Sequence, residues 1–170
     1  MFNLPTYPLQ SEEESTKTAY APLFCWDIAN PALARRILIH EDLFALNKLI
    51  ELYNWSLDLK IKQLLVDNYT MIVTNLNQEI TWVSNGFESM TGYTSKEVAG
   101  KRPSFLQGKK TNLKTKTLIR EKLTNFENIE IKILNYRKDG EAYWCMVKIH
   151  PIRTKNNVVT HFIAIEKEVH

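Results

Sequence analysis

Three long segments in the C-terminal part of the sequence alternate between apolar and polar residues, and this pattern constrains the fold more than any other feature. The segments are Ile129–Tyr136, Glu141–Ile152 and Val158–Val169. Only the turns Arg137–Gly140 and Lys155–Asn157 separate them. Connections this short cannot carry a chain back across a sheet, so the three segments are expected to pair as antiparallel strands.

Shorter segments of changing character precede these strands. Tyr69–Thr74 and Glu79–Ser84 have the composition of two strands joined by a polar turn. Helical turns are expected at Asn85–Thr91, Thr94–Val98 and Leu113–Leu123. Two strands, several short helices and three further strands, all with short connections, predict an α+β fold with an antiparallel sheet.

The part of the chain before these strands divides into an arm and a helical segment. Residues 1–26 are rich in proline and acidic residues and are expected to form a flexible arm. Residues 27–67 lack glycine, and Pro31 suits a first helical turn, so this stretch is expected to be mainly helix. The polar run His40–Asp42 is a candidate break. Residues 68–170 then form the domain that contains the sheet.

The helix expected at residues 41–67 carries apolar residues on two sides. One row recurs at alternating steps of three and four, as in a coiled-coil seam: Leu43, Leu46, Ile50, Tyr53 and Leu57. A second row consists of Phe44, Leu52, Trp55 and Leu59. A helix that is apolar on two sides must bury both. Either both rows pack within one monomer, or one row meets a partner subunit, and we favour a homodimer.

Composition and charge exclude several classes of protein. The chain has 170 residues, 44% of them hydrophobic and 24% charged, which is typical of a globular domain rather than a disordered segment. Its net charge of +3 is too small to indicate nucleic-acid binding by itself. The sequence contains neither an apolar run of roughly 18 residues nor a signal peptide. We therefore expect a soluble, cytoplasmic protein that binds neither nucleic acid nor membrane.

No residue pattern in the sequence supports catalysis or metal binding. The two cysteines, Cys25 and Cys145, lie too far apart in sequence for a CxxC site. The four histidines show no metal-ligand spacing, and neither a Ser/His/Asp set nor a glycine-rich phosphate loop is evident. The sequence therefore predicts a protein that is not an enzyme and holds no metal.

A series of short strings between residues 68 and 168 resembles the PAS superfamily and, within it, the LOV (light-oxygen-voltage) branch. The strings occur in the order and spacing of that family: Asn85–Phe87, Thr91–Tyr93, Glu97–Gly100, Phe105–Gly108, Ile119–Arg120, Ile133–Gly140 and Tyr143–Trp144. The resemblance implies a five-stranded antiparallel sheet that cups a pocket, with small helices closing over it.

The resemblance also implies a flavin pocket, and three positions match residues that contact the flavin. Gln107, Asn135 and Arg120 correspond to residues that contact its ribityl, ring and phosphate groups. LOV members form a light-driven bond between the flavin ring and a cysteine, and the matching position here is Pro103. Proline has no thiol, so no adduct can form from this position.

Other positions of the resemblance have changed. Arg102 stands where the family has asparagine, and Ser104 where it has a phosphate-binding arginine. Cys145 and Glu166 replace the asparagine and glutamine that contact the ring. An ionised Glu166 would place a carboxylate, which only accepts hydrogen bonds, opposite the ring carbonyls, which also accept them. Each charge-assisted hydrogen bond that is lost costs about 1.5–3 kcal/mol of binding free energy. We expect no cofactor, with FMN as the alternative, and a pocket filled by its own side chains or by another ligand. Cys145 is read as a small buried hydrophobe, with a relocated reactive thiol as the alternative.

Strand alternation predicts a second apolar sheet face. If Asn135 and Cys145 face the pocket, the opposite face carries Trp144, Met146, Ile163 and Ile165. The helix expected at 41–67 would cover this face, from the same chain or from a neighbour. We therefore predict a dimeric sensory PAS protein that acts through protein–protein contacts, without cysteine-adduct photochemistry. The alternative is a flavin-binding blue-light receptor that works by adduct-free photoreduction.

Overall fold

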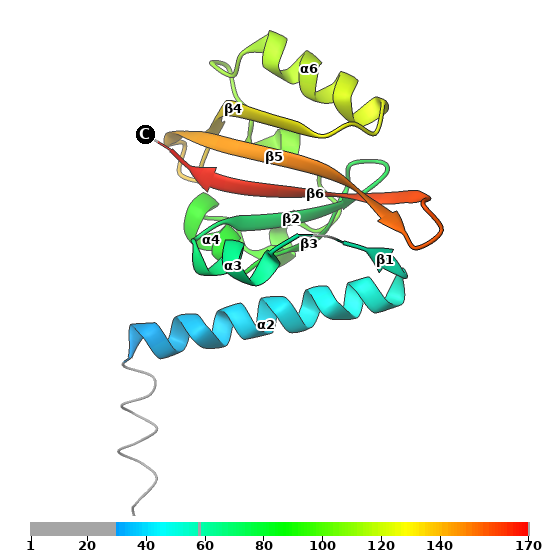
Figure 1. Ribbon diagram of the computed structural model, residues 1–170. Helices are drawn as coiled ribbons and strands as arrows, with labels where there is room; N and C mark the ends of the chain where they lie inside the picture. Colours follow the sequence, from blue (N-terminus) through cyan, green and yellow to red (C-terminus); the bar gives the residue numbers. More distant parts are fainter. Residues whose placement is uncertain (1–29, 58, 170) are drawn as a thin grey trace, which may run out of the picture. The chain divides into compact units, whose positions relative to one another are not determined.

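The computed structural model describes residues 30–57 and 59–169 (Figure 1). The arm expected at 1–26 and the helix start expected at 27–29 lie outside the described residues. The chain divides into two units, Met1–Arg36 and Ile37–His170. Within the described residues, the first unit contributes only the start of one helix, and the second contains the rest of that helix and all the other elements.

The elements follow the predicted order closely. The first are α2 (Pro31–Leu52), β1 (Trp55–Ser56), α3 (Ile61–Val66), β2 (Thr70–Asn75) and β3 (Ile80–Val83). Short helices follow: α4 (Gly86–Thr91), α5 (Ser95–Val98), the 3-10 helix η1 (Pro103–Leu106) and α6 (Leu113–Thr124). The last three are β4 (Ile129–Tyr136), β5 (Ala142–Thr154) and β6 (Val159–Glu168). The three long strands predicted from alternation are therefore confirmed.

All strands belong to one antiparallel sheet. Its order is β4–β5–β6–β2–β3, and the two-residue β1 pairs with the far end of β5. The α+β class and the antiparallel sheet of five main strands are thus confirmed, and β1 adds a short sixth strand that the sequence did not predict. Strand β2 pairs with β6, so the first and the last of the five main strands lie next to each other in the sheet.

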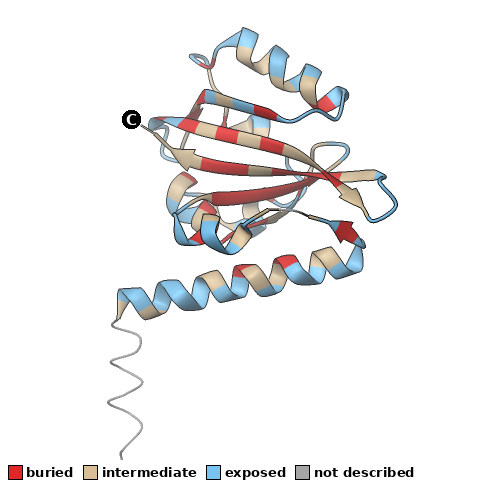
Figure 2. Cartoon of the chain, in the orientation of Figure 1, coloured by how far each residue is buried: buried red, intermediate tan, exposed pale blue. Residues whose placement is uncertain are grey.

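The sheet packs on both of its faces. On one face, Met71 and Val73 of β2 pack with Ile163 of β6 and Leu46 of α2. On the other face, Ile72 packs with residues of the short helices α4, α5 and η1. Figure 2 shows β2 buried along its length, whereas α2 carries buried residues only on its inner side. The strands of the sheet centre therefore separate two apolar layers.

The helix expected at residues 41–67 is wrong in its extent. The α2 helix runs without a break through His40–Asp42 and ends at Leu52. Asn54 then adopts a left-handed backbone conformation, and the chain enters β1. There the Trp55 ring is buried, stacks on Tyr53 and donates its indole N–H to the Thr160 hydroxyl. Burying this large ring at the sheet edge outweighs the helical spacing that predicted a longer helix.

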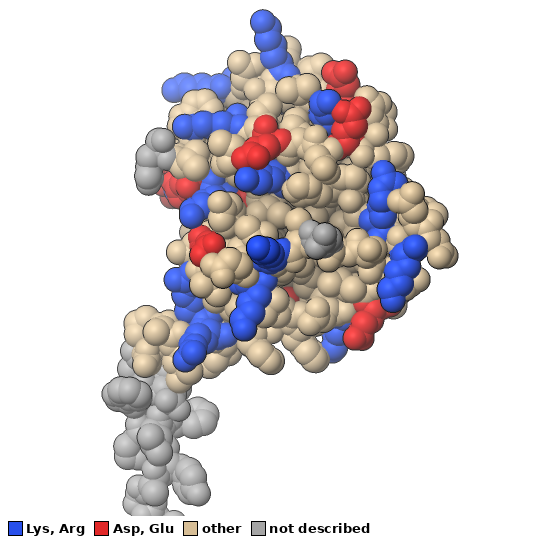
Figure 3. Space-filling model, in the orientation of Figure 1, with Lys and Arg blue, Asp and Glu red and all other residues tan. Residues whose placement is uncertain are grey.

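Charged side chains are dispersed over one face of the molecule (Figure 3). On the face shown in Figure 3, lysine and arginine side chains are spread among uncharged and acidic ones. Within the described residues, no helix has the length and apolar character needed to cross a bilayer. The same residues contain no group of three histidine, cysteine or acidic side chains arranged to hold a metal ion.

Candidate functional site

A cavity of about 100 Å³ lies between the sheet and the elements η1 and α6. Its apolar walls come from all these elements: Leu106, Ile119, Leu123, Ile133, Val147, Ile149, Phe162 and Ala164. Its polar lining consists of Thr74, Gln78, Ser104, Gln107, Asn135 and Glu166. We call this space the core cavity. No sequence pattern marks Thr74 and Gln78 as site residues, because only the folded sheet brings their hairpin to the cavity.

Gln107 and Asn135 are held side by side at one end of the core cavity. Their backbones form an isolated antiparallel bridge, and both residues line the cavity. The following loop lies so close to β4 that a Cβ atom at Gly108 would be 2.3 Å from the ring of Tyr136. The Thr111 hydroxyl also ties this loop to β4, because it donates to the Leu134 carbonyl at 2.6 Å. Glycine at this position therefore allows the close approach that pairs the two amides.

Glu166 brings a carboxyl group into the same cavity from β6. Its side chain is buried, and burial raises the pKa of Glu166 to about 7. The thiol of Cys145 lies 3.8 Å from Glu166 Oε2 and is a weak donor. Burial also raises the pKa of Cys145, with the nearby Glu166 charge as a second cause. The thiol is therefore protonated at neutral pH and poorly nucleophilic.

The two remaining predicted site residues are placed differently. Pro103 lines the core cavity from the first position of η1, where a proline ring suits a helix start. Arg120 lies on α6, is exposed and is not among the residues that line the cavity. The structure thus brings Pro103, Gln107, Asn135 and Glu166 together around one space, with Cys145 in contact with Glu166.

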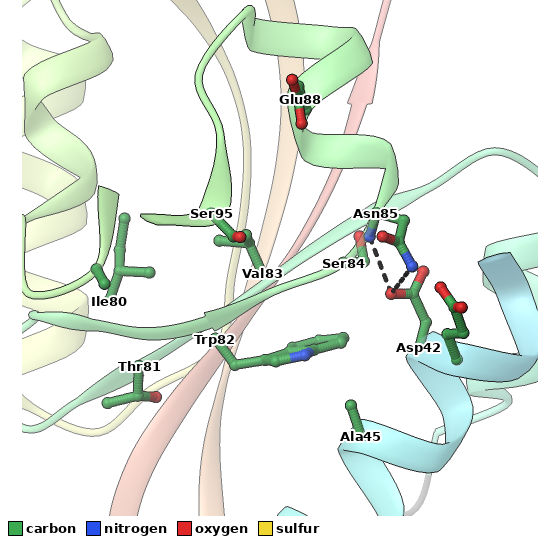
Figure 4. A pocket seen from close by; sticks show the side chains of 12 residues that line it. Asp42, Ala45, Ile80, Thr81, Trp82, Val83, Ser84, Asn85, Glu88 and Ser95 are labelled. Carbon is green, nitrogen blue, oxygen red and sulfur yellow. Dashed lines mark hydrogen bonds between the residues drawn. The ribbon is translucent and has the colours of Figure 1, made fainter. Parts of the chain in front are cut away.

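A second hollow, of about 370 Å³, lies between α2 and the elements β3, α4 and α5 (Figure 4). On its rim, Asp42 Oδ1 accepts hydrogen bonds from the backbone N–H of Asn85 at 2.9 Å and from Asn85 Nδ2 at 3.0 Å. Asp42 is buried, and this burial raises its pKa to about 6, with Glu41 adding to the rise. We call this pair the Asp42–Asn85 latch, because it ties α2 to the start of α4.

The predicted coiled-coil seam packs on the sheet of the same chain. Leu46 is fully buried against β2 and β6, and Leu43, Ile50 and Leu57 pack against the same cluster. Tyr53 stacks on Trp55 instead of continuing a helix. The opposite side of α2 carries Ile37, Phe44 and Leu52, whose residues are 51%, 56% and 72% exposed. We call these three residues the outer row of α2.

The predicted sheet face is covered only in part. Ile163 and Ile165 are buried in the cluster that includes α2. Trp144, on β5, remains 46% exposed, and Met146 is half-buried. The ammonium group of Lys132 lies 5.2 Å from the centre of the Trp144 ring. In this chain α2 therefore helps to bury β2, β6 and Ile152 near the end of β5, whereas the same face of β5 remains partly open at Trp144.

The fold and the cavity identify the family. The chain belongs to the PAS domain family, whose model matches residues 68–170. Phototropin-1A of Oryza sativa subsp. japonica is 43% identical over 96 residues, which are 56% of this chain and 10% of phototropin-1A. A blue-light-activated histidine kinase of Brucella anthropi is 35% identical over 102 residues, 58% of this chain and 21% of the kinase. The chain therefore spans a tenth to about a fifth of these relatives.

Solved structures give the same assignment. The LOV domain of a blue-light-activated histidine kinase from Erythrobacter litoralis has a TM-score of 0.56 and 29% identity. The match covers 59% of this chain and 95% of that domain. A light-oxygen-voltage domain studied with a flavin analogue has a TM-score of 0.61 and 29% identity, over 65% of this chain and 84% of the other. The chain is thus a LOV-like PAS domain, similar to sensory domains of signalling proteins.

The residues that surround the core cavity do not fit a flavin nucleotide. Its volume of about 100 Å³ is well below the roughly 300 Å³ at which pockets for drug-sized ligands begin. None of the described residues that line it is a lysine, arginine or histidine, so no cation faces a phosphate group there. Glu166 adds a buried carboxyl to the lining, and an ionised carboxyl can only accept hydrogen bonds.

Proposed function

We propose that this chain is a sensory PAS module that forms a homodimer and signals by protein–protein contact, without cysteine-adduct photochemistry. The state of the core cavity biases how α2 packs, and a partner protein reads that change. The outer row of α2 is the observation that carries this proposal.

The outer row supports a dimer because the inner side of α2 is already used. Leu46 and its neighbours close the sheet face of their own chain. Ile37 and Phe44 are seven residues apart, which is about two turns, and Leu52 follows after about two more. These exposed apolar side chains therefore form one stripe, which a second copy of the chain can bury.

Strand β6 provides the connection between the core cavity and α2. Successive residues of a strand point to opposite faces of the sheet. Ala164 and Glu166 line the cavity, whereas Ile163 and Ile165 pack in the cluster that includes α2. A ligand or proton that shifts β6 would therefore change the surface on which α2 lies.

Two residues support the absence of an adduct. Pro103, which lines the cavity, stands at the position that the LOV resemblance assigns to the reactive cysteine. Among the described residues, Cys145 is the cysteine beside the cavity, and its raised pKa keeps it protonated. Neither side chain supplies the thiolate that attack on a bound ring requires.

A flavin receptor that works by photoreduction is the second candidate. The paired amides of Gln107 and Asn135 favour it, since both line the cavity as the LOV resemblance predicts. The cavity volume and the position of Glu166 weigh against it. We therefore place it second to the interaction module.

Light scattering on the purified full chain tests the dimer. We expect the wild type to be dimeric at high concentration and Phe44→Asp to be monomeric, because a carboxylate in the outer row would be buried without a partner. Leu113→Asp is the matched control, since Leu113 is 75% exposed on α6, and it should remain dimeric. A wild type that stays monomeric, or a Phe44→Asp variant that stays dimeric, contradicts the proposal.

A further inference from the structure

Glu166 is the one side chain with an acidic or basic group among the described residues that line the core cavity. It is buried, and within the described part of the chain its only hydrogen-bond donor is the Cys145 thiol at 3.8 Å. A buried carboxyl without a strong donor or a cation is costly. The site therefore favours a ligand that brings N–H donors or positive charge to this group.

The charged groups around Glu166 favour the same kind of ligand. Its ionisable neighbours on β5 are Cys145 and Tyr143, which are both acids, and burial raises the pKa of each. The guanidinium of Arg137 lies 4.6 Å from the Tyr143 ring centre but pairs with Glu168 and Glu141. From β2, η1 and α6, the described lining residues add no charge. An anionic ligand therefore has no partner in this cavity.

The size of the cavity limits the ligand to one small ring. Its volume is about 100 Å³, and an apolar cavity of about 150 Å³ is known to hold benzene. The walls formed by Val147, Ile149 and Phe162 suit the faces of a flat ring. The side-chain amides of Gln107 and Asn135 each offer a carbonyl acceptor in addition to Glu166.

We propose that the core cavity binds a planar nitrogen base of a single five- or six-membered ring, which donates N–H groups to Glu166 and to an amide carbonyl of Gln107 or Asn135. The complex contains one proton between base and carboxyl. That proton lies on the ring nitrogen, so that a cationic ring donates N–H to the Glu166 carboxylate. This inference rests on the proposed function, because it names the ligand class of the sensory cavity.

Imidazole is the probe, titrated into the full chain and followed by amide chemical shifts in two-dimensional NMR. We expect saturable shifts at β5 and β6 residues around Glu166. Pyrazole, an isomer of the same size that is uncharged at neutral pH, should bind about tenfold more weakly or worse. Shifts that do not saturate, or that centre on the Asp42–Asn85 latch, overturn the proposal.

Two variants on the same strand test the role of Glu166. Glu166→Gln should weaken imidazole binding about tenfold or more, because the charge-assisted hydrogen bond is lost. Glu168→Gln is the matched control two residues along β6, and it should bind within about twofold of wild type. Equal affinity in wild type and Glu166→Gln overturns the proposal, and the amide spectra show directly whether each variant is folded.

The pH dependence gives a further readout. Since Glu166 and imidazole both titrate near neutrality, the complex with one shared proton should be tightest near pH 7 and weaker on both sides. A constant affinity between about pH 5 and pH 9 contradicts the proposal.

An absorption spectrum of the same sample separates the outcomes. A bound flavin overturns both this inference and the proposed function. A flavin-free protein that does not bind imidazole overturns this inference alone.

Discussion

Asp42 holds α2 to Asn85 by hydrogen bonds, but the burial of its carboxyl group disfavours the ionised form. Its carboxylate accepts two hydrogen bonds from Asn85, yet burial raises its pKa from 3.8 to about 6. The folded state therefore holds the proton more tightly than the unfolded state. Its contribution to stability is complete below pH 3.8 and is lost as the pH rises through about 6.

Replacement of Asp42 by asparagine should remove this pH dependence. Asparagine keeps an oxygen that can accept from Asn85 but carries no charge to bury. At about pH 7.5 we expect Asp42→Asn to be more stable than wild type by on the order of 1–3 kcal/mol, and the two proteins to be similar near pH 4. Urea unfolding at the two pH values measures this difference. A variant less stable than wild type at the higher pH would show that the latch gains more from ionisation than burial costs.

Glu166 should behave in the same direction over a higher pH range. Burial raises its pKa from 4.5 to about 7, so stability is lost as the pH rises through about 7. Glu166→Gln should therefore stabilise the protein at about pH 8 by on the order of 1–3 kcal/mol and change little near pH 4.5. Thermal unfolding at both pH values is the measurement, with Glu168→Gln as the control. An equal shift at both pH values would exclude titration as the cause.

Single residues of the site can be predicted from the sequence where their types match a family pattern. Residues whose role depends on a partner that only the fold brings near cannot. Gln107 and Asn135 are predicted from such strings, and the structure places both on the cavity. Asp42, in contrast, lies in a run that the sequence predicted to break the helix. Its role is not visible in the sequence, because only the folded chain brings Asn85 to it. The signal that the sequence does contain is the position of Asp42 four residues before Leu46. This spacing places the carboxyl on the same, inward-facing side of the helix.

At the scale of elements, α2 has one row that stabilises the monomer and one that does not. Leu46→Ala should cost about 2–5 kcal/mol of unfolding free energy, because it leaves a void against β2 and β6. Phe44→Ala, on the 56% exposed position two residues earlier, should change monomer stability by less than about 0.5 kcal/mol. Denaturant unfolding at low protein concentration tests this. Similar losses in both variants would mean that the outer row also packs within one chain.

The strands are more predictable than the helical segment. Alternation predicts β4 with its observed bounds, and β5 and β6 within two residues, since a strand with one buried face leaves a period of two in the sequence. The segment 53–66 has helical spacing, yet it turns at Asn54 and forms β1 and α3. Its path depends on the burial of Trp55 against the distant Thr160, which no local pattern records.

At the scale of the whole molecule, the sheet separates two tasks. One face and its short helices enclose the core cavity, and the other carries α2 with the latch and the outer row. Because β6 contributes alternate residues to both, a change in the cavity can reach α2 without any moving domain. The content of the cavity therefore determines which signal α2 can receive.

An absorption spectrum of the full chain, purified after expression with added flavin, shows whether the cavity holds a flavin. We predict no visible absorption band, because a cavity of about 100 Å³ with a buried carboxyl and no cation among its described lining residues does not hold a flavin nucleotide. The structured blue absorption of a protein-bound flavin, retained through gel filtration, would contradict a flavin-free cavity and make photoreduction the leading function.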